Sequence, residues 1–75
     1  MSYQEFSKKV IALHTTTRGF DSDHYVQSHI IFRGKLFSIS KRKYVGVPGL
    51  ALAKELAIDD AYQKYIREIN EKICG

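Results

Sequence analysis

Three histidines are the first candidates for chemistry, because a neutral imidazole is a common ligand of zinc and copper. They stand at positions 14, 24 and 29, and the sequence has one cysteine, Cys74. His24 and His29 fall on opposite parities of one extended segment, so their side chains point to opposite faces. Neither this spacing nor the lone cysteine fits a zinc motif. We therefore expect no metal and no cofactor.

Acidic pairs are the second candidates, because two nearby carboxylates can perform acid–base catalysis. Asp21 and Asp23 lie in a Gly/Ser-containing stretch that is typical of a turn. Asp59 and Asp60 fall on the polar side of a helical pattern. The glycines of Val45–Gly49 lack the lysine and the spacing of a phosphate loop. With no nucleophile–base or metal set in the sequence, we expect a protein that is not an enzyme.

Positive charge is concentrated in the middle of the chain. The net charge of the 75 residues is +4, and the segment 33–43 contains five cations and no acid. An acid-free cationic segment favours binding of a polyanion. The cations are Arg33, Lys35, Lys41, Arg42 and Lys43.

Alternation of apolar and polar residues predicts the strands that position these cations. In His24–Phe32, Val26, Ile30 and Phe32 share one parity, with the small Ser28 between them. The segment 33–35 predicts a tight hairpin turn around Gly34. In the following strand, strict alternation puts Phe37 and Ile39 on one face. We expect an apolar face covered by a helix and a polar face open to solvent, the latter presenting Tyr25, Gln27, His29, Ser38, Ser40 and Arg42.

Helical spacing is found at both ends of the chain. Ser2 and Glu5 have capping-box spacing, and apolar residues then recur at helical intervals as far as Leu13. Thr15–Thr17 favour a short first strand. After Gly49 a long helix is expected, with Leu52 and Leu56 off its apolar stripe. That stripe comprises Ala51, Ile58, Tyr62, Tyr65, Ile66, Ile69 and Ile73.

These elements predict a single α+β domain, residues 1–75. It would hold a short N-terminal helix or arm (1–13), a three-stranded antiparallel sheet (14–44) and one long C-terminal helix (50–73) packed against the sheet. No apolar run is long enough to span a bilayer, and no apolar core follows the N-terminal charges. We expect a cytoplasmic protein with no membrane partner.

The segment Gly34–Gly46 also resembles a known pattern, a Gly-Lys turn followed by F-S-x-S-x-x-K-Y-G and a helix rich in alanine. The matching residues are Gly34, Lys35, Phe37, Ser38, Ser40, Lys43, Tyr44 and Gly46, with Ala53 and Ala57 suiting the helix that follows. The pattern is similar to small phage and bacterial relatives of the ethylene-response-factor (APETALA-two) DNA-binding domain, and to the arm-binding N-terminal domains of tyrosine recombinases. The resemblance covers about residues 18–65, and it departs from the family at Tyr25 or Val26, where the family has tryptophan.

The resemblance implies a three-stranded sheet that binds DNA through its exposed face. The acid-free basic hairpin and the apolar/polar alternation of its strands lead us to predict a small DNA-binding protein of phage or mobile-element type that binds double-stranded DNA in the major groove. Arg42 would contact guanine and Gln27 adenine, while Tyr25 and His29 donate or stack. Ser38 and Ser40 would bond phosphate. The phosphate clamps would be Arg33, Lys35, Lys41 and Lys43.

Three alternatives remain open from the sequence. The same cations would suit RNA or an acidic protein. A protein-interaction module, such as a phage-type modulator of a host protein, could use a sheet edge or Leu52 and Leu56. The long helix could also form a homodimer.

Overall fold

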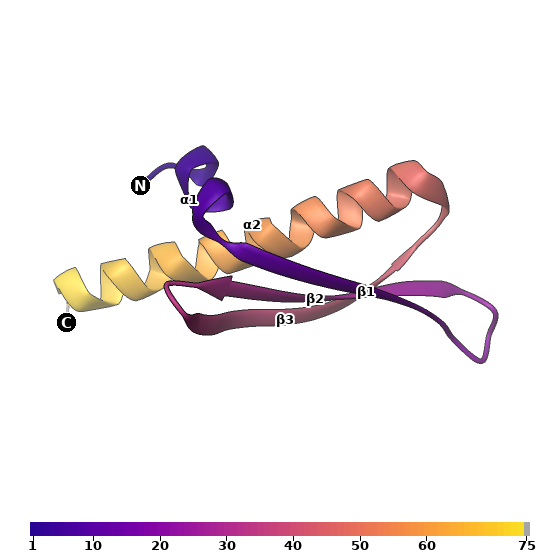
Figure 1. Cartoon of the computed structure of the whole chain (residues 1–75). Coiled ribbons are helices and arrows are strands. Elements are labelled where there is room, and N and C mark those ends of the chain that lie inside the picture. The colour runs from indigo at the N-terminus through magenta and orange to yellow at the C-terminus, as the bar shows by residue number, and fades with distance from the viewer. Residues whose placement is uncertain (75) are drawn as a thin grey trace.

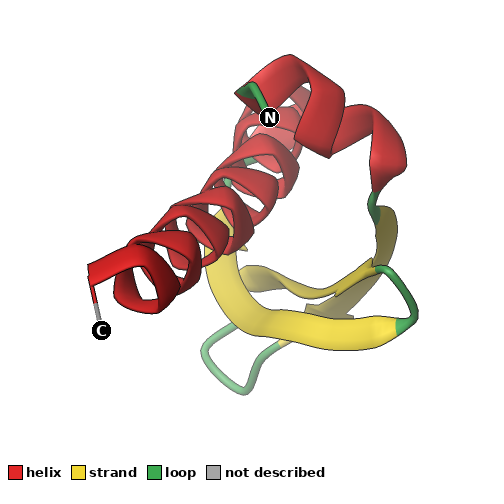
Figure 2. Cartoon of the chain, turned by 90° about the vertical axis from the view of Figure 1, so that its left-hand side faces the viewer, coloured by secondary structure: helices red, strands yellow, loops and turns green. Residues whose placement is uncertain are grey.

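The computed structural model describes residues 1–74, with side chains as far as Lys72. The elements are α1 (Tyr3–Lys9), β1 (Ile11–Arg18), β2 (His24–Phe32), β3 (Lys35–Tyr44) and α2 (Gly46–Cys74). The strands form one antiparallel sheet in the order β1-β2-β3, and both helices lie on the same side of it (Figures 1 and 2). The predicted α+β architecture is confirmed.

The N-terminal helix begins as the capping box predicts but is shorter than the apolar spacing suggests. The Ser2 hydroxyl accepts a hydrogen bond from the amide of Glu5 at 3.3 Å. The helix ends at Lys9, and Val10 is already extended. From Ile11 onward the chain pairs with β2, so Leu13 lies on a strand and not on the helix. Cross-strand pairing overrides the local helical spacing here.

The β2–β3 hairpin turns where it is predicted to turn. Arg33 and Gly34 have φ of 55° and 76°, the left-handed pair that a two-residue type I′ turn requires. Two residues into β3 the register shifts, because Ile31 lies opposite Leu36 whereas Ile30 lies opposite Ser38. Phe37 is therefore an extra residue, a β-bulge. Beyond it the alternation of faces is reversed relative to the strict pattern.

The long helix begins at Gly46, four residues earlier than predicted. Gly46 has φ +70°, which glycine adopts without strain, and Pro48 lies in the first turn, where its missing amide hydrogen costs nothing. The first half of α2 buries Ala53, Ala57 and Ala61, whereas the predicted Ala51 is exposed. Small residues at intervals of four let the helix approach the sheet closely.

The second half of α2 follows the predicted stripe. Ile58, Tyr62 and Tyr65 pack partly buried against the core, while Leu52 and Leu56 are exposed and off the stripe, as expected. The predicted contribution of Ile73 lies outside the described side chains. Within the described chain, neither helix combines the length and the apolar character that a membrane crossing requires.

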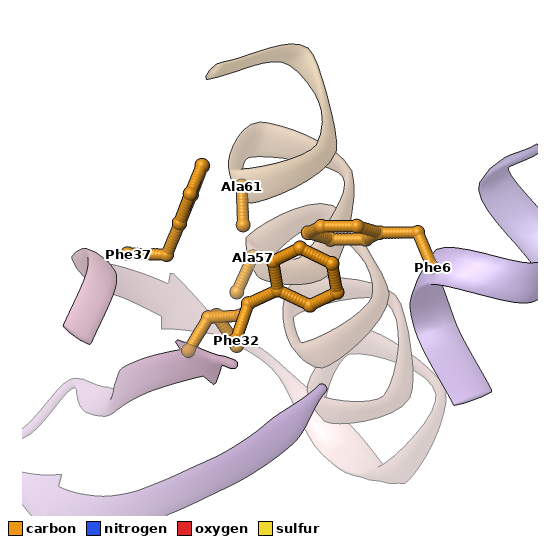
Figure 3. Close-up of a cluster of buried hydrophobic side chains, with 6 residues drawn as sticks. Phe6, Phe32, Phe37, Ala57 and Ala61 are labelled. Carbon is orange, nitrogen blue, oxygen red and sulfur yellow. The ribbon is translucent and has the colours of Figure 1, made fainter. Parts of the chain in front are cut away.

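The core lies between the helices and one face of the sheet. Phe6 of α1 is fully buried, and its ring centroid lies 4.7 Å from that of Phe32. Figure 3 shows Phe6 reaching from α1 toward Phe32, next to Ala57 and Ala61 of α2. The core cluster consists of Phe6, Ile30, Phe32, Phe37, Ala57 and Ala61.

One hydrogen-bonded pair of polar side chains lies on the same face of the sheet as this core. Ser28 on β2 is buried, as its inward parity predicts, and its hydroxyl lies 2.7 Å from Nδ1 of His14 on β1. The hydrogen bond satisfies a hydroxyl that would otherwise lose its water partners.

Candidate nucleic-acid interface

The face of the sheet opposite the helices carries no packed element among residues 1–74 (Figure 2). Side chains that pair across neighbouring strands share a face, so the register fixes which residues this open face presents. Its residues divide into two halves along the strands. The polar half, next to the β1–β2 turn, contains Thr15, Thr17, Tyr25, Gln27, Lys41 and Lys43. The apolar half, next to the β2–β3 turn, contains Ile11, Leu13, His29, Ile31, Leu36 and Ile39.

Tyr25 organises the polar half. Its hydroxyl donates to Asp21 at 2.8 Å, and the ammonium of Lys41 lies 5.2 Å from the centroid of its ring. Lys43 forms an ion pair with Asp23 at 3.0 Å. The two turn carboxylates are thus engaged by β2 and β3 side chains, whereas no ion pair of Lys41 is found within the described part of the chain. Of the two lysines of the polar half, Lys41 is therefore the more available to an outside anion.

The same contacts fix the charge state of these groups. The hydrogen bond from Tyr25 holds the pKa of Asp21 below its ordinary value, and it raises the pKa of the Tyr25 hydroxyl. The hydrogen bond to Asp23 raises the pKa of Lys43. At neutral pH Asp21 is therefore ionised, Tyr25 is a neutral donor and Lys43 is a cation.

An open hollow adjoins the polar half at the tip of the β1–β2 hairpin. It has a volume of about 510 Å³ and is lined by Gly19, Phe20, Asp21, Tyr25 and Lys41. Phe20 is fully exposed at this tip. The arrangement places two aromatic rings, the ammonium of Lys41 and the carboxylate of Asp21 around one concave surface, which suits the stacking of a flat group.

Three predicted interface residues lie on the other side of the sheet, and the prediction of their face is wrong. Ser38, Ser40 and Arg42 pair with the buried row of β2 residues and face the helices. Arg42 forms an ion pair with Asp60 of α2, and its Nε is buried. The cause is the bulge at Phe37, which keeps that ring in the core and reverses the faces of every later residue of β3.

The other predicted residues separate into two groups. Tyr25, Gln27 and His29 are on the open face as predicted, although His29 lies in the apolar half. Arg33 and Lys35 lie at the opposite end of the sheet from the polar half (Figure 1). There they border a hollow of about 280 Å³ against α2, with Phe37, Tyr65 and Glu68 among its lining residues. The structure therefore brings together Tyr25, Gln27, Lys41 and Lys43.

Two polar and two apolar residues of β1 were missed by the sequence analysis. Thr15 and Thr17 complete the polar half, and Ile11 and Leu13 complete the apolar half. The four residues share one parity of an eight-residue strand. The alternation along this strand could have identified all four residues from the sequence. It did not, because Ile11–Leu13 also fits a helical spacing.

The charges of the protein are sorted by layer. The three strands contain no acidic residue, although they contain five cations: Arg18, Lys35, Lys41, Arg42 and Lys43. The eight acids lie on the two helices or in the β1–β2 turn, at Glu5, Asp21, Asp23, Glu55, Asp59, Asp60, Glu68 and Glu71. The strands are thus positively charged, whereas the helices balance their acids with an equal number of cations, at Lys8, Lys9, Lys54, Lys64, Arg67 and Lys72.

In the described part of the chain, no three or more histidine, cysteine and carboxylate side chains lie close enough together to hold a metal ion. Comparisons of the chain with protein-family models, with curated proteins and with solved structures gave no match.

Proposed function

We propose that the protein binds double-stranded DNA through the polar half of the open face. The observation that carries this proposal is the sorting of charge: the strands hold five cations and no acid, while the acids lie on the helices and in one turn. A polyanion approaching the open face meets Lys41 and Lys43, whereas Lys35 and Arg42 face the helices. The helix α2 and its acids lie behind the sheet (Figure 1). The proposal assigns no catalytic step to the chain.

The shape of the polar half supports a groove-binding role. Lys41 pairs with Gln27 and Lys43 pairs with Tyr25 across β2 and β3. Two antiparallel strands form a ribbon of the width that the major groove admits. The amide of Gln27 would then face base edges, where it matches adenine, while the longer lysine side chains reach outward to the phosphates.

Lys41 is the residue on which the proposal depends most. It is exposed, it lies over the ring of Tyr25, and it has no ion-pair partner among residues 1–72. Lys43 would also contact a phosphate, but only by giving up its ion pair with Asp23. The loss of that ion pair offsets part of the binding free energy of the phosphate contact. Arg18, at the far end of β1, borders the hairpin tip together with Lys41 and Phe20.

The test is a salt series measured by fluorescence anisotropy on a labelled DNA duplex. Each phosphate contact contributes a slope of about −0.9 in log K against log salt, so contacts from Lys41, Lys43 and Arg18 give a slope of about −2.7. Lys41→Ala should weaken binding to all sequences and make the slope shallower by about 0.9. Lys72→Ala on α2 is the matched control, because it removes the same charge from the opposite layer, and it should leave the slope unchanged.

Two results would count against the proposal. Equal effects of Lys41→Ala and Lys72→Ala would mean that only net charge matters. Tighter binding to the matched RNA duplex than to DNA would make RNA the ligand of this surface, since an A-form helix presents a different groove.

A further inference from the structure

The apolar half of the open face is the least expected surface of the protein. Four of its aliphatic side chains are about half exposed, with exposed fractions of 59% for Ile11, 53% for Leu13, 47% for Leu36 and 54% for Ile39. Single exposed apolar residues are ordinary on protein surfaces, but a contiguous group of them marks an interaction site.

These side chains are contiguous because of the register. Ile31 lies between Ile11 and Leu36 in one cross-strand row. In the next row His29 lies between Leu13 and Ile39. Two adjacent rows on three strands make one patch, and both helices lie on the far side of the sheet, so no described element covers it (Figure 2).

A second copy of the chain is a poor occupant of this patch. The patch is smaller than the roughly 800 Å² that each partner of a stable interface contributes. A self-complementary contact would have to extend over the polar half, where Lys41 has no ion-pair partner among residues 1–72. Two chains of net charge +4 would then bring cations against cations.

The charges around the patch indicate the complementary partner. Lys41 lies at the end of the patch that adjoins the polar half, and no strand residue is acidic. Arg33 and Lys35, at the β2–β3 turn, border the hollow against α2 on the helix side. At the centre of the patch the imidazole of His29 can donate to a carboxylate. Charge complementarity therefore calls for a partner with apolar side chains over the patch and acids that face His29 and Lys41.

The form of the patch favours a helix as that partner. The aliphatic side chains stand on the face of the sheet and not along its edges, so a strand added at β1 or β3 would leave them uncovered. The outer strands lie about 10 Å apart, which is close to the diameter of one α-helix. The other face of the same sheet already packs against α2 in this manner.

We propose that the apolar half docks an acidic amphipathic helix of another protein, with His29 and Lys41 facing its carboxylates. The completed assembly would have helices on both faces of the sheet. This docking does not depend on the polar half binding nucleic acid.

The test uses synthetic peptide probes and the intact chain. The first probe is an 18-residue helical peptide with leucine at positions i, i+3, i+4 and i+7 and glutamate on the flanks. The second has the same composition in scrambled order, and the third replaces every glutamate by lysine. The docking proposal predicts binding of the first probe alone, with NMR amide shifts gathered on residues 11–13, 29–31 and 36–39.

The variants separate this patch from other exposed apolar surface. The double variant Leu13→Thr, Ile39→Thr should weaken binding of the first peptide by about tenfold or more. Threonine suits a strand, so the fold should persist, as circular dichroism and thermal melting would verify. Val47→Thr is the matched control, because Val47 is 80% exposed on α2, and it should leave the affinity unchanged.

Three outcomes would overturn the proposal. They are equal binding of the ordered and scrambled peptides, an unchanged affinity in the folded double variant, or sedimentation showing a dimer that the double variant dissociates. Duplex binding, measured in the same variants, should survive the loss of Leu13 and Ile39. Failure of the docking proposal is therefore distinguishable from failure of DNA binding.

Discussion

Arg42 of β3 forms an ion pair with Asp60 of α2, so its guanidinium joins the sheet to the helix and does not face solvent on the open side. Strict alternation from Phe37 would have directed Arg42 outward as a candidate base-contacting residue. The bulge at Phe37 reverses that direction and gives Arg42 a structural role.

Removing this pair should change stability and not sequence preference. The side chains of Arg42 and Asp60 are 34% and 49% exposed, so solvent screening keeps their coupling below about 1 kcal/mol. Arg42→Ala should also lose the packing of its stem, for a total loss of about 0.5–1.5 kcal/mol in the free energy of unfolding. Urea titrations of Arg42→Ala, Asp60→Asn and the double variant would measure the coupling. A shift in DNA sequence preference in Arg42→Ala would contradict this assignment.

A pair of phenylalanines tests where the core is. Phe6 is fully buried and joins α1 to the sheet, whereas Phe20 is fully exposed at the β1–β2 tip. Phe6→Ala should lower the free energy of unfolding by about 3–5 kcal/mol, which is much of the stability of so short a chain. Phe20→Ala should change it by less than about 0.5 kcal/mol. Chemical denaturation followed by circular dichroism checks both, and equal losses would contradict the packing of α1.

Most of the fold could be predicted from the sequence because its signals are local. The Ser2 cap, the tight turn at Gly34 and the inward Ser28 each depend on a few neighbouring residues, and each is confirmed. The bulge depends on a competition among distant parts of the chain. The Phe37 ring packs with Phe6 of α1 and Tyr65 of α2, and no alternation within β3 contains that information.

The candidate site could be predicted only in part, for the same reason. Tyr25 and Gln27 were correctly assigned to the open face of the sheet because β2 is regular. Lys41 was expected as a clamp at a strand end, and its place on the open face next to Tyr25 follows from the bulge. The apolar half could not be predicted from the sequence, because Leu13 fits both a helical and a strand spacing. Only its pairing with His29 decides between the two.

The His14–Ser28 pair predicts a loss of stability in mild acid. Burial, and then the charge of Lys54, lower the pKa of His14 below its ordinary value of 6.5. The folded state therefore binds the proton more weakly than the unfolded state. The contribution of neutral His14 to the free energy of unfolding is complete above a pH of about 6.5. It is lost as the pH falls from there through the lowered pKa of His14 in the folded state.

Urea unfolding at pH 8 and at pH 5 would measure that loss. His14→Gln should flatten the pH dependence over this interval, because the glutamine does not titrate. His24→Gln is the matched control, since His24 is an exposed histidine at the start of β2. If His24→Gln flattened the dependence as much as His14→Gln, the assignment to the buried pair would be wrong.

Gln27 and Ser40 together test which face of the sheet contacts DNA. Gln27 is on the open face opposite Lys41, whereas Ser40 pairs with the buried Ser28 on the helix side. Gln27→Ala should relax sequence preference at one or two positions, at a cost of about 1–3 kcal/mol for the preferred base, and should leave the salt slope unchanged. Ser40→Ala should alter neither preference nor affinity. Selection from a randomised duplex library, followed by anisotropy on the selected site, makes the comparison. If Ser40→Ala relaxed the preference and Gln27→Ala did not, the DNA contact would have to lie on the helix side of the sheet.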